Sequence, residues 1–330
     1  MNPRILVTGG TGLLGSYMLR WFRHHGYTNL TATFHNDSKT LPADLQQGIE
    51  WKKLVLPDIQ DTHEIISGMD WVIHTAAYIG YNKNEKAKLL AINQEGTKHI
   101  VNACLEHQVK HFIYVGSIGA LGKEKNFATL NEASPWLQNE FSTTYGLSKY
   151  LGELEAWRGS IEGLNVTAVL PSVILGTGDW QRSSLQIFDR VAKKSGWYPG
   201  GQTGYVDVRD LANFIGLILE KNKPGERWIL NAENLSYEKI YMMIGQALGL
   251  QKNFRPAPRW LANVILYSIS LMTGKQLGKE ILAPAYATFS YDHSRSLELD
   301  GFSYRPISET ILEVAEIYKA GDGSRTLRIQ

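Results

Sequence analysis

A tyrosine and a lysine four residues apart are the two side chains of this sequence best suited to proton transfer. Tyr145 and Lys149 fall in a segment with helical periodicity, so both side chains lie on one face of the expected helix. A free tyrosine has a pKa of about 10, and an adjacent ammonium group lowers that pKa by favouring the phenolate. Tyr145 thereby becomes a usable acid or base, although the spacing alone also fits a solvated helix face.

Ser117 ends a predicted strand at 111–117, at a place where a ligand would bind. In a parallel α/β sheet the ligand crevice opens at the carboxyl ends of the strands. A serine hydroxyl there could hydrogen-bond a substrate oxygen and polarise it as hydride arrives. One polar loop, at 121–141, separates Ser117 from the helix that carries Tyr145 and Lys149. Together the three side chains predict a reductase or dehydrogenase site, in which Lys149 could also hold the nicotinamide ribose.

A glycine-rich turn near the N-terminus indicates the cofactor of such a site. Residues 5–15, ILVTGGTGLLG, read as a short apolar strand, a glycine turn and the start of a helix. Its glycines fit both the usual dinucleotide fingerprint and a wider variant, and they let the backbone approach a pyrophosphate at a helix N-terminus. No lysine follows the last glycine, which argues against a nucleotide-triphosphate P-loop. The expected cradle consists of Gly9, Thr11, Gly12, Leu13, Leu14 and Gly15.

The residues after the predicted strand at 30–34 bear on the choice between NAD and NADP. An acidic side chain at this place holds the adenosine ribose hydroxyls, whereas a basic one accommodates a 2′-phosphate. Asp37 lies a little late in the sequence, while His35, Ser38 and Lys39 could bind a phosphate. We therefore favour NADP, with NAD as the alternative. The other interpretation of these residues is a polar loop without a ligand.

Residues after the later strands complete the expected nucleotide site. Asp58, after the predicted strand at 50–56, could accept a hydrogen bond from the adenine amino group. Small residues after the strand at 70–77 would let a cofactor lie against the sheet edge. His74 reads as a core histidine, because nothing nearby has metal-ligand spacing, and we expect no metal. The other expected contacts are Ile59, Thr75, Ala76, Ala77 and Pro171 for the cofactor, and Ile79, Ser117, Ser172 and Trp180 for the substrate.

Strands that alternate with helical segments predict an α/β fold with a doubly wound parallel sheet, the Rossmann fold. We expect a dinucleotide-binding domain at 1–171, with return segments at about 203–232. A smaller, mostly helical substrate-binding domain is expected at 172–202 and 233–320. The tail at 321–330 is expected to be loose.

Composition narrows the class of protein and its partners. The 330 residues are 43% apolar and carry a formal net charge of +2, which favours a globular protein and gives no sign of a nucleic-acid partner. The N-terminus runs straight into the first strand, so we expect no signal peptide and a cytoplasmic protein. The apolar stretch at 260–272 is too short to span a bilayer. Peripheral attachment of this stretch to a membrane is the weaker interpretation, because it has no basic polar face.

Taken together, the motifs resemble those of the extended short-chain dehydrogenase/reductases, the NAD-dependent epimerase and dehydratase superfamily, over nearly the whole chain. The resemblance implies Ser117, Tyr145 and Lys149 as a catalytic triad, with Asn93 supporting a proton-relay water near Lys149. It also implies a homodimer that pairs the helices around 86–106 and 145–158. The motifs are Thr8-Gly9-x-x-Gly12-x-x-Gly15, Asp58-Ile59, His74-x-Ala76-Ala77, Asn93-x-x-Gly96-Thr97, Ser117 and Tyr145-x-x-x-Lys149.

Two missing features favour the reductases within this superfamily. Ile118, Gly119 and Ala120 follow Ser117, where the sugar-nucleotide 4,6-dehydratases carry an acidic pair. The strand that ends at Pro171 lacks the asparagine with which the epimerases bind a diphosphate. Five aromatic residues suggest a less polar pocket, or are simply core: Trp180, Trp197, Tyr198, Trp260 and Tyr286.

We therefore expect an NAD(P)-dependent reductase or dehydrogenase that is similar to dihydroflavonol 4-reductase-like proteins. Its small-molecule substrate would be a carbonyl compound or secondary alcohol of mainly apolar character. The alternative is a sugar-nucleotide epimerase that keeps NAD bound. A third hypothesis is a regulator that senses NAD(P) without catalysis, although such proteins usually lack the tyrosine or the lysine.

Overall fold

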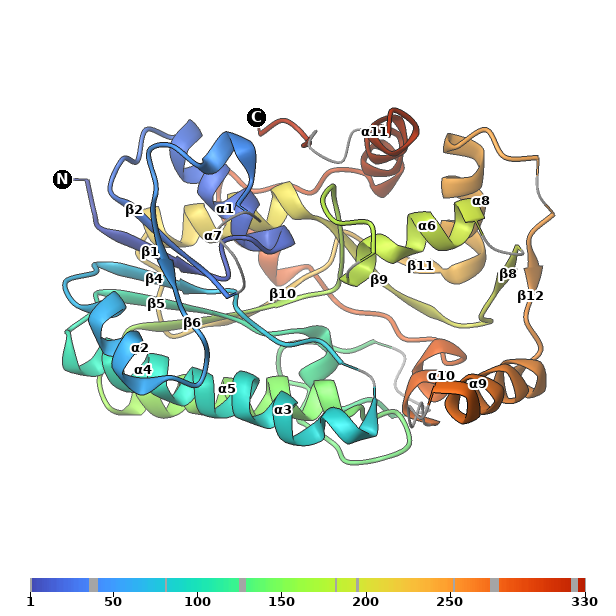
Figure 1. The fold of residues 1–330 in the computed structure, drawn as a ribbon, viewed down its shortest axis with the longest axis horizontal. Helices are drawn as coiled ribbons and strands as arrows, with labels where there is room; N and C mark the ends of the chain where they lie inside the picture. The colour runs from blue at the N-terminus through green and yellow to red at the C-terminus, as the bar shows by residue number, and fades with distance from the viewer. Residues whose placement is uncertain are drawn as a thin grey trace.

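A seven-stranded parallel sheet forms the centre of the computed structural model (Figure 1). The structure describes residues 2–35, 41–80, 82–124, 129–181, 183–193, 196–251, 253–273, 279–321 and 326–329. The strand order is β10-β6-β5-β4-β1-β2-β3. The strand numbers rise from β1 toward both edges of the sheet, as the doubly wound prediction requires. The strands are β1 (Ile5–Thr8), β2 (Leu30–Phe34), β3 (Glu50–Lys53), β4 (Trp71–His74), β5 (His111–Val115), β6 (Val166–Pro171) and β10 (Arg227–Leu230).

Helices cover both faces of this sheet (Figure 1). On one face, α1 (Leu13–His24) packs against α7 (Val208–Glu220), and Gly216 gives room to the ring of Trp21. On the other face, α2 (Ile59–Ile66) and α5 (Thr144–Ile161) both pack against α4 (Gly96–Glu106). A short helix α3 (Lys86–Leu90) and a π-helical turn (Ala91–Glu95) lead into α4. β1 and β5 are buried along their whole length, which agrees with their mainly apolar sequences.

A smaller lobe follows β6 in the chain. It contains a three-stranded sheet in the order β11-β9-β7 and a two-stranded sheet of β8 and β12. The segment expected to return to the main sheet at 203–232 is therefore divided, since β9 pairs in the smaller lobe while β10 pairs with β6. The elements of this lobe are β7 (Val173–Leu175), α6 (Gln186–Lys193), β8 (Trp197–Tyr198), β9 (Gln202–Asp207), β11 (Glu233–Ser236), α8 (Tyr237–Ala247), β12 (Arg255–Pro256), α9 (Arg259–Thr273), α10 (Lys279–Ala285) and α11 (Ile307–Lys319).

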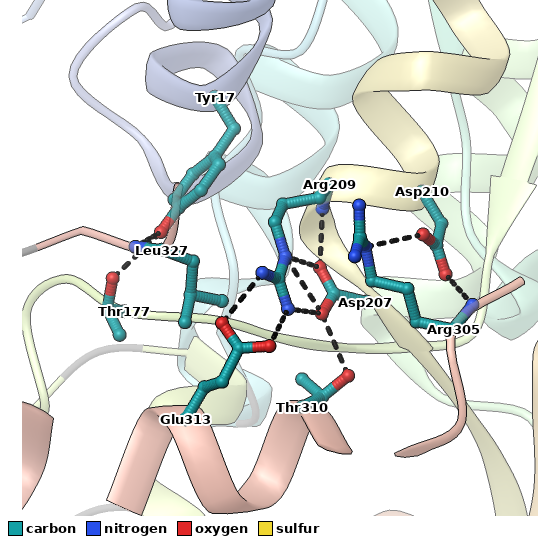
Figure 2. Close-up of polar contacts among 9 residues, drawn as sticks. All are labelled: Tyr17, Thr177, Asp207, Arg209, Asp210, Arg305, Thr310, Glu313 and Leu327. Carbon is teal, nitrogen blue, oxygen red and sulfur yellow. Dashed lines mark hydrogen bonds and ion pairs between the residues drawn. The ribbon is translucent and has the colours of Figure 1, made fainter. Parts of the chain in front are cut away.

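A buried ionic network ties α7 to α11 (Figure 2). The Arg209 guanidinium donates hydrogen bonds to Asp207, at 2.7 Å, and to Glu313 on α11, at 2.8 Å. Thr310 donates to the same Asp207 carboxylate at 2.8 Å. Asp207 is fully buried, so the Arg209 guanidinium and the Thr310 hydroxyl offset the cost of removing its charge from water.

The segment that was expected to be a loose tail is packed where the structure describes it. The Leu327 backbone N–H donates a 2.8 Å hydrogen bond to the Tyr17 hydroxyl on α1, which also pairs with Thr177 (Figure 2). The Leu327 side chain is 2% exposed and belongs to the main hydrophobic core. Burial of this apolar side chain is what holds residues 326–329 in place. Among the described helices, none is both long enough and apolar enough to cross a membrane.

Candidate active site

Lys149 on α5 is anchored to the carboxyl end of β5. Its ammonium nitrogen donates a 2.6 Å hydrogen bond to the Val115 carbonyl oxygen and lies 4.7 Å from the centre of the Tyr114 ring. The residue is 2% exposed, and this burial lowers the pKa of Lys149 to about 7. Glu153, one turn further along α5, acts in the opposite direction and raises the pKa. Lys149 is therefore a cation whose charge is lost near neutral pH.

The turn after β5 approaches α5 unusually closely. A Cβ atom added to Gly146 would lie 2.3 Å from the Gly119 carbonyl oxygen, a distance that no real side chain tolerates. Thr143 caps α5 here, accepting a 2.8 Å hydrogen bond from the Gly146 N–H. Glycine at 146 thus brings the first turn of α5 against the residues that directly follow Ser117. The prediction that Tyr145 and Lys149 belong to one helix is confirmed, and that helix borders the end of β5.

Ser117 lies two residues beyond the end of β5 and is half-buried. Its Oγ accepts a 3.0 Å hydrogen bond from the Gly119 N–H. That bond uses a lone pair of the oxygen and not its hydrogen, so the hydroxyl keeps a donor for a substrate oxygen. Tyr145, also half-buried, stands in the first turn of α5 beside this segment. The catalytic roles of both residues stay predictions at this point.

Asn93 is held by partners on α5 and on the loop after β4, and its support of a proton-relay water stays a prediction. Its side chain donates to Ser148 Oγ at 2.9 Å and to the Tyr78 carbonyl oxygen at 2.9 Å, and it accepts from the Tyr78 N–H at 2.7 Å. Ser148 in turn donates to the Tyr145 carbonyl oxygen at 2.8 Å. Gly152 allows this contact, since a Cβ there would lie 2.4 Å from the Asn93 carbonyl oxygen. Asn93 therefore ties the loop after β4 to the turn of α5 that carries Tyr145.

Sequence reasoning missed Ser148 and Tyr78 as parts of this arrangement. Ser148 falls between Tyr145 and Lys149 in a helical segment, and an isolated serine there gives no signal of its own. Tyr78 contributes through its backbone, which any residue type could supply. His74, at the end of β4, pairs with Thr8 at 2.8 Å and Thr97 at 3.1 Å, and burial lowers its pKa to about 3. The expectation of a satisfied core histidine is confirmed.

The glycine turn has the shape that a dinucleotide requires. Gly9 has a φ of +69°, and a Cβ on it would lie 2.9 Å from the Ala76 Cα atom. At Gly15 an added Cβ would lie 2.3 Å from the Gly9 carbonyl oxygen, so the helix can begin immediately against the turn. Gly12, at the N-terminus of α1, is exposed. The turn lies beside the reversal of strand order between β1 and β4, and these residues fit a pyrophosphate.

The other expected cofactor contacts are spread along the same edge of the sheet. His35 follows β2 and is exposed, whereas Lys39, Asp37 and Ser38 lie outside the described residues. Asp58 caps α2 and accepts a 2.8 Å hydrogen bond from the Asp61 N–H. Thr11 and Leu13 are partly exposed at the start of α1, Leu14 and Pro171 are buried, and Ile59, Thr75, Ala76 and Ala77 keep some exposure.

The expected substrate contacts differ in their surroundings. Ser172 follows β6, and its Oγ is buried without a hydrogen-bond partner among the described residues. Ile79 is 41% exposed on the loop that Asn93 holds. The Trp180 ring packs edge-on against Tyr318, at 5.0 Å between ring centres, and against Phe188. Trp180 therefore contributes to the core of the smaller lobe, and its contact with substrate stays a prediction.

Comparison with known proteins identifies the family. The model of the NAD dependent epimerase/dehydratase family matches residues 5–231 of the chain. The protein belongs to this family. A putative dihydroflavonol 4-reductase of Synechocystis is 26% identical over 270 residues, which cover 79% of this chain and 77% of that protein. Cinnamoyl-CoA reductase 1 of rice (Oryza sativa) is 27% identical over 258 residues, covering 73% and 74% of the two chains.

Solved structures agree with this family in fold. The dTDP-glucose 4,6-dehydratase DesIV of Streptomyces venezuelae, solved with NAD bound, superposes with a TM-score of 0.77 over 97% of this chain and 98% of its own. The sequence identity is 16%, so the likeness concerns the fold. Family and fold together make this epimerase/dehydratase family member an NAD(P)-dependent oxidoreductase of the extended short-chain dehydrogenase/reductase type with a nicotinamide cofactor.

Proposed function

We propose that this family member transfers hydride between a nicotinamide cofactor and a carbonyl or secondary alcohol of a mainly apolar small molecule. In this proposal Tyr145 exchanges the proton, Lys149 lowers the pKa of Tyr145, and Ser117 orients the substrate oxygen. The observation that supports it most is the hydrogen bond from Lys149 Nζ to the Val115 carbonyl oxygen, at 2.6 Å. That bond brings the face of α5 with Tyr145 to the strand end that precedes Ser117.

In this proposal Ser117, Tyr145 and Lys149 each have a separate role in the transfer of the proton. The bound nicotinamide supplies or accepts the hydride at the substrate carbon. In the reducing direction the Ser117 hydroxyl donates a hydrogen bond to the carbonyl oxygen, and Tyr145 gives this oxygen its phenolic proton. The Lys149 ammonium stabilises the phenolate that remains. In the oxidising direction the same phenolate removes the proton from the alcohol. Asn93 and Ser148 act by fixing the helical turn of Tyr145.

Two places in the structure support an apolar carbonyl compound over a sugar nucleotide. The turn after Ser117 is Ile118–Ala120, a single 3-10 turn without a carboxylate, so an acid to expel a hydroxyl group is not supplied there. Beyond β6, Ser172 and Val173 offer no amide side chain for a diphosphate. The relatives named as dihydroflavonol 4-reductase and cinnamoyl-CoA reductase are reductases, which supports hydride transfer to a substrate over epimerisation.

For the cofactor we propose NADP over NAD. His35 follows β2 and is exposed, and neither of the described residues at the end of that strand, Phe34 and His35, is acidic. A carboxylate there would repel a 2′-phosphate, whereas an imidazole can donate a hydrogen bond to it. We also propose a cytoplasmic homodimer that pairs α4 and α5 of two copies. Leu154 on α5 is 45% exposed and would be covered in such a dimer. A monomeric mass in solution would contradict this pairing.

The decisive experiment compares Tyr145→Phe with the unchanged protein on a panel of apolar ketones and aldehydes. We expect the variant to bind NADPH normally, as measured by the shift in melting temperature, and to lose turnover by about a hundredfold or more. Unchanged turnover would contradict the role of Tyr145. The same panel includes UDP-glucose. Interconversion of the sugar by protein that retains NAD through purification would favour the epimerase, and cofactor binding without turnover of any compound would favour a regulator.

A further inference from the structure

Helix α9 leaves a set of large apolar side chains in contact with water. Exposed fractions run from 38% for Ile269 to 86% for Met272. We call this set the α9 surface: Trp260, Val264, Ile265, Tyr267, Ile269, Leu271 and Met272. Figure 1 shows α9 beside α10 at one end of the long axis, away from β2 and α1. Trp260, Val264, Tyr267 and Leu271 recur at helical spacing on one face of α9, and a monomer rarely exposes this many large apolar side chains on one helix face, so the α9 surface indicates a contact with another molecule or with a lipid layer.

The stretch of sequence that contains α9, residues 239–279, has basic residues and no acidic ones. Six of the 34 Lys and Arg residues lie within 239–279, and none of the 32 Asp and Glu residues do. Among the described members, Lys239, Arg255 and Arg259 are exposed. Arg259 is the first residue of α9, and Arg255 on β12 lies four residues before it. The N-terminal end of the apolar helix therefore carries two exposed cations among the described residues, in a chain whose total charge is nearly balanced.

This combination argues against a second copy of the chain as the occupant. In a two-fold symmetric contact the same patch meets itself, so each cationic segment would face its own copy. An anionic lipid surface has the opposite sign and an apolar layer beneath its headgroups. Trp260 and Tyr267 have the amphipathic rings that favour this boundary. With 15 residues, α9 is long enough to lie in the boundary and too short to cross the bilayer.

We propose that the α9 surface docks on a membrane that contains anionic lipids, with α9 lying in the plane of the headgroups. Trp260, Val264, Tyr267 and Leu271, which share one face of α9, enter the apolar layer. Arg255 and Arg259 contact lipid phosphates. The contact is peripheral and reversible, because it rests on one short helix and a few charges. It places the smaller lobe of the reductase at the surface where apolar compounds concentrate. Docking itself does not depend on the proposed catalytic function.

The test is sedimentation of the full-length chain with lipid vesicles. One set contains phosphatidylcholine alone, and the other contains about a third phosphatidylglycerol. We expect binding to the anionic vesicles, with at least about tenfold weaker partitioning onto the neutral ones and a decline as salt is added. Equal partitioning onto both vesicle types, or none onto either, would overturn the proposal. The readout needs neither cofactor nor turnover, so its outcome is separate from that of the reductase assignment.

A pair of matched variants assigns the binding to α9. Val264→Asp with Ile265→Asp adds two charges to the α9 surface, and Ile161→Asp with Leu312→Asp adds the same charge at exposed apolar positions of α5 and α11. We expect the first to lower partitioning by about tenfold or more and the second to leave it within about twofold. Arg259→Glu is compared in the same way with Lys223→Glu, because Lys223 is an exposed lysine outside α9. If the α9 variants instead halve the mass in solution without changing vesicle binding, a second copy covers this surface and the proposal fails.

Discussion

The Lys149 ammonium nitrogen lies 2.6 Å from the carbonyl oxygen of Val115, the last residue of β5. A side chain from a helix thus donates a hydrogen bond to a backbone carbonyl at the carboxyl end of a central strand. The bond fixes the register between α5 and β5, and with it the approach of Tyr145 to the segment of Ser117. If these residues form the proposed site, this contact positions the reacting groups in advance of the substrate.

The charge of Lys149 predicts how the rate of reduction depends on pH. Burial lowers the pKa of Lys149 to about 7, so in the ligand-free enzyme the ammonium form is present below this pH and is lost above it. A neutral lysine no longer favours the phenolate of Tyr145. We expect kcat/KM for carbonyl reduction to fall as pH rises through about 7, approaching about tenfold per pH unit. A profile that is flat between about pH 6 and pH 9 would remove Lys149 from this role.

The close approach of Gly146 to Gly119 predicts a variant with intact cofactor binding and poor catalysis. In Gly146→Ala the new methyl group would meet the Gly119 carbonyl oxygen at 2.3 Å, and the start of α5 has to move. We expect kcat/KM to fall by about a hundredfold, because a shift of about 1 Å is enough to misalign reacting groups. The control is Gly200→Ala, where the added atom has its nearest neighbour at 3.9 Å. Equal activities of the two variants would refute the argument.

His35 predicts the cofactor preference and a way to reverse it. In His35→Asp a carboxylate stands after β2, where it repels a 2′-phosphate and can accept from ribose hydroxyls. We expect the Kd for NADPH to rise by about tenfold or more and the Kd for NADH to fall. Fluorescence titration with both nucleotides measures this ratio. Tighter binding of NADH than NADPH by the unchanged protein would contradict the NADP proposal.

Two buried histidines predict a loss of stability in acid. Burial lowers the pKa of His74 to about 3 and that of His111 to about 4, so both stay neutral in the fold while the unfolded chain protonates them below about pH 6.5. The unfolded state then binds more protons, and stability decreases as pH falls. Between pH 7 and pH 5 each histidine accounts for about 2 kcal/mol of this decrease in the free energy of unfolding.

Urea unfolding of His111→Gln checks this effect. We expect the variant to show a loss between pH 7 and pH 5 that is smaller by about 2 kcal/mol than in the unchanged protein. His24→Gln provides the control, because His24 is exposed on α1. An identical pH dependence in all three proteins would show that His111 is protonated in the fold.

The parts of the site that the sequence predicts are those with local signals. The glycine turn at Gly9 and Gly15, the serine after β5 and the helical spacing of Tyr145 and Lys149 each depend on neighbours within a few residues. Doubly wound topology follows from the alternation of strands and helices, and the structure confirms it.

What could not be predicted depends on contacts between distant segments. Asn93 meets Ser148 only because a π-helical turn and Gly152 bring two helices together, and neither has a sequence signature that fixes the contact. The apolar pattern of α9 predicts its helix, but the same pattern fits a core helix as well as an exposed one. Trp180 likewise reads as a pocket residue or a core residue until its partner Tyr318 is seen.

The hydrogen bond between the Tyr17 hydroxyl and the Leu327 N–H joins residues that are 310 positions apart. During synthesis α1 leaves the ribosome early, yet this phenol lacks that partner until almost all of the chain described here has been translated. A chain truncated before Leu327 would lack this contact, and the Tyr17 hydroxyl would be left with Thr177 or solvent as its partner.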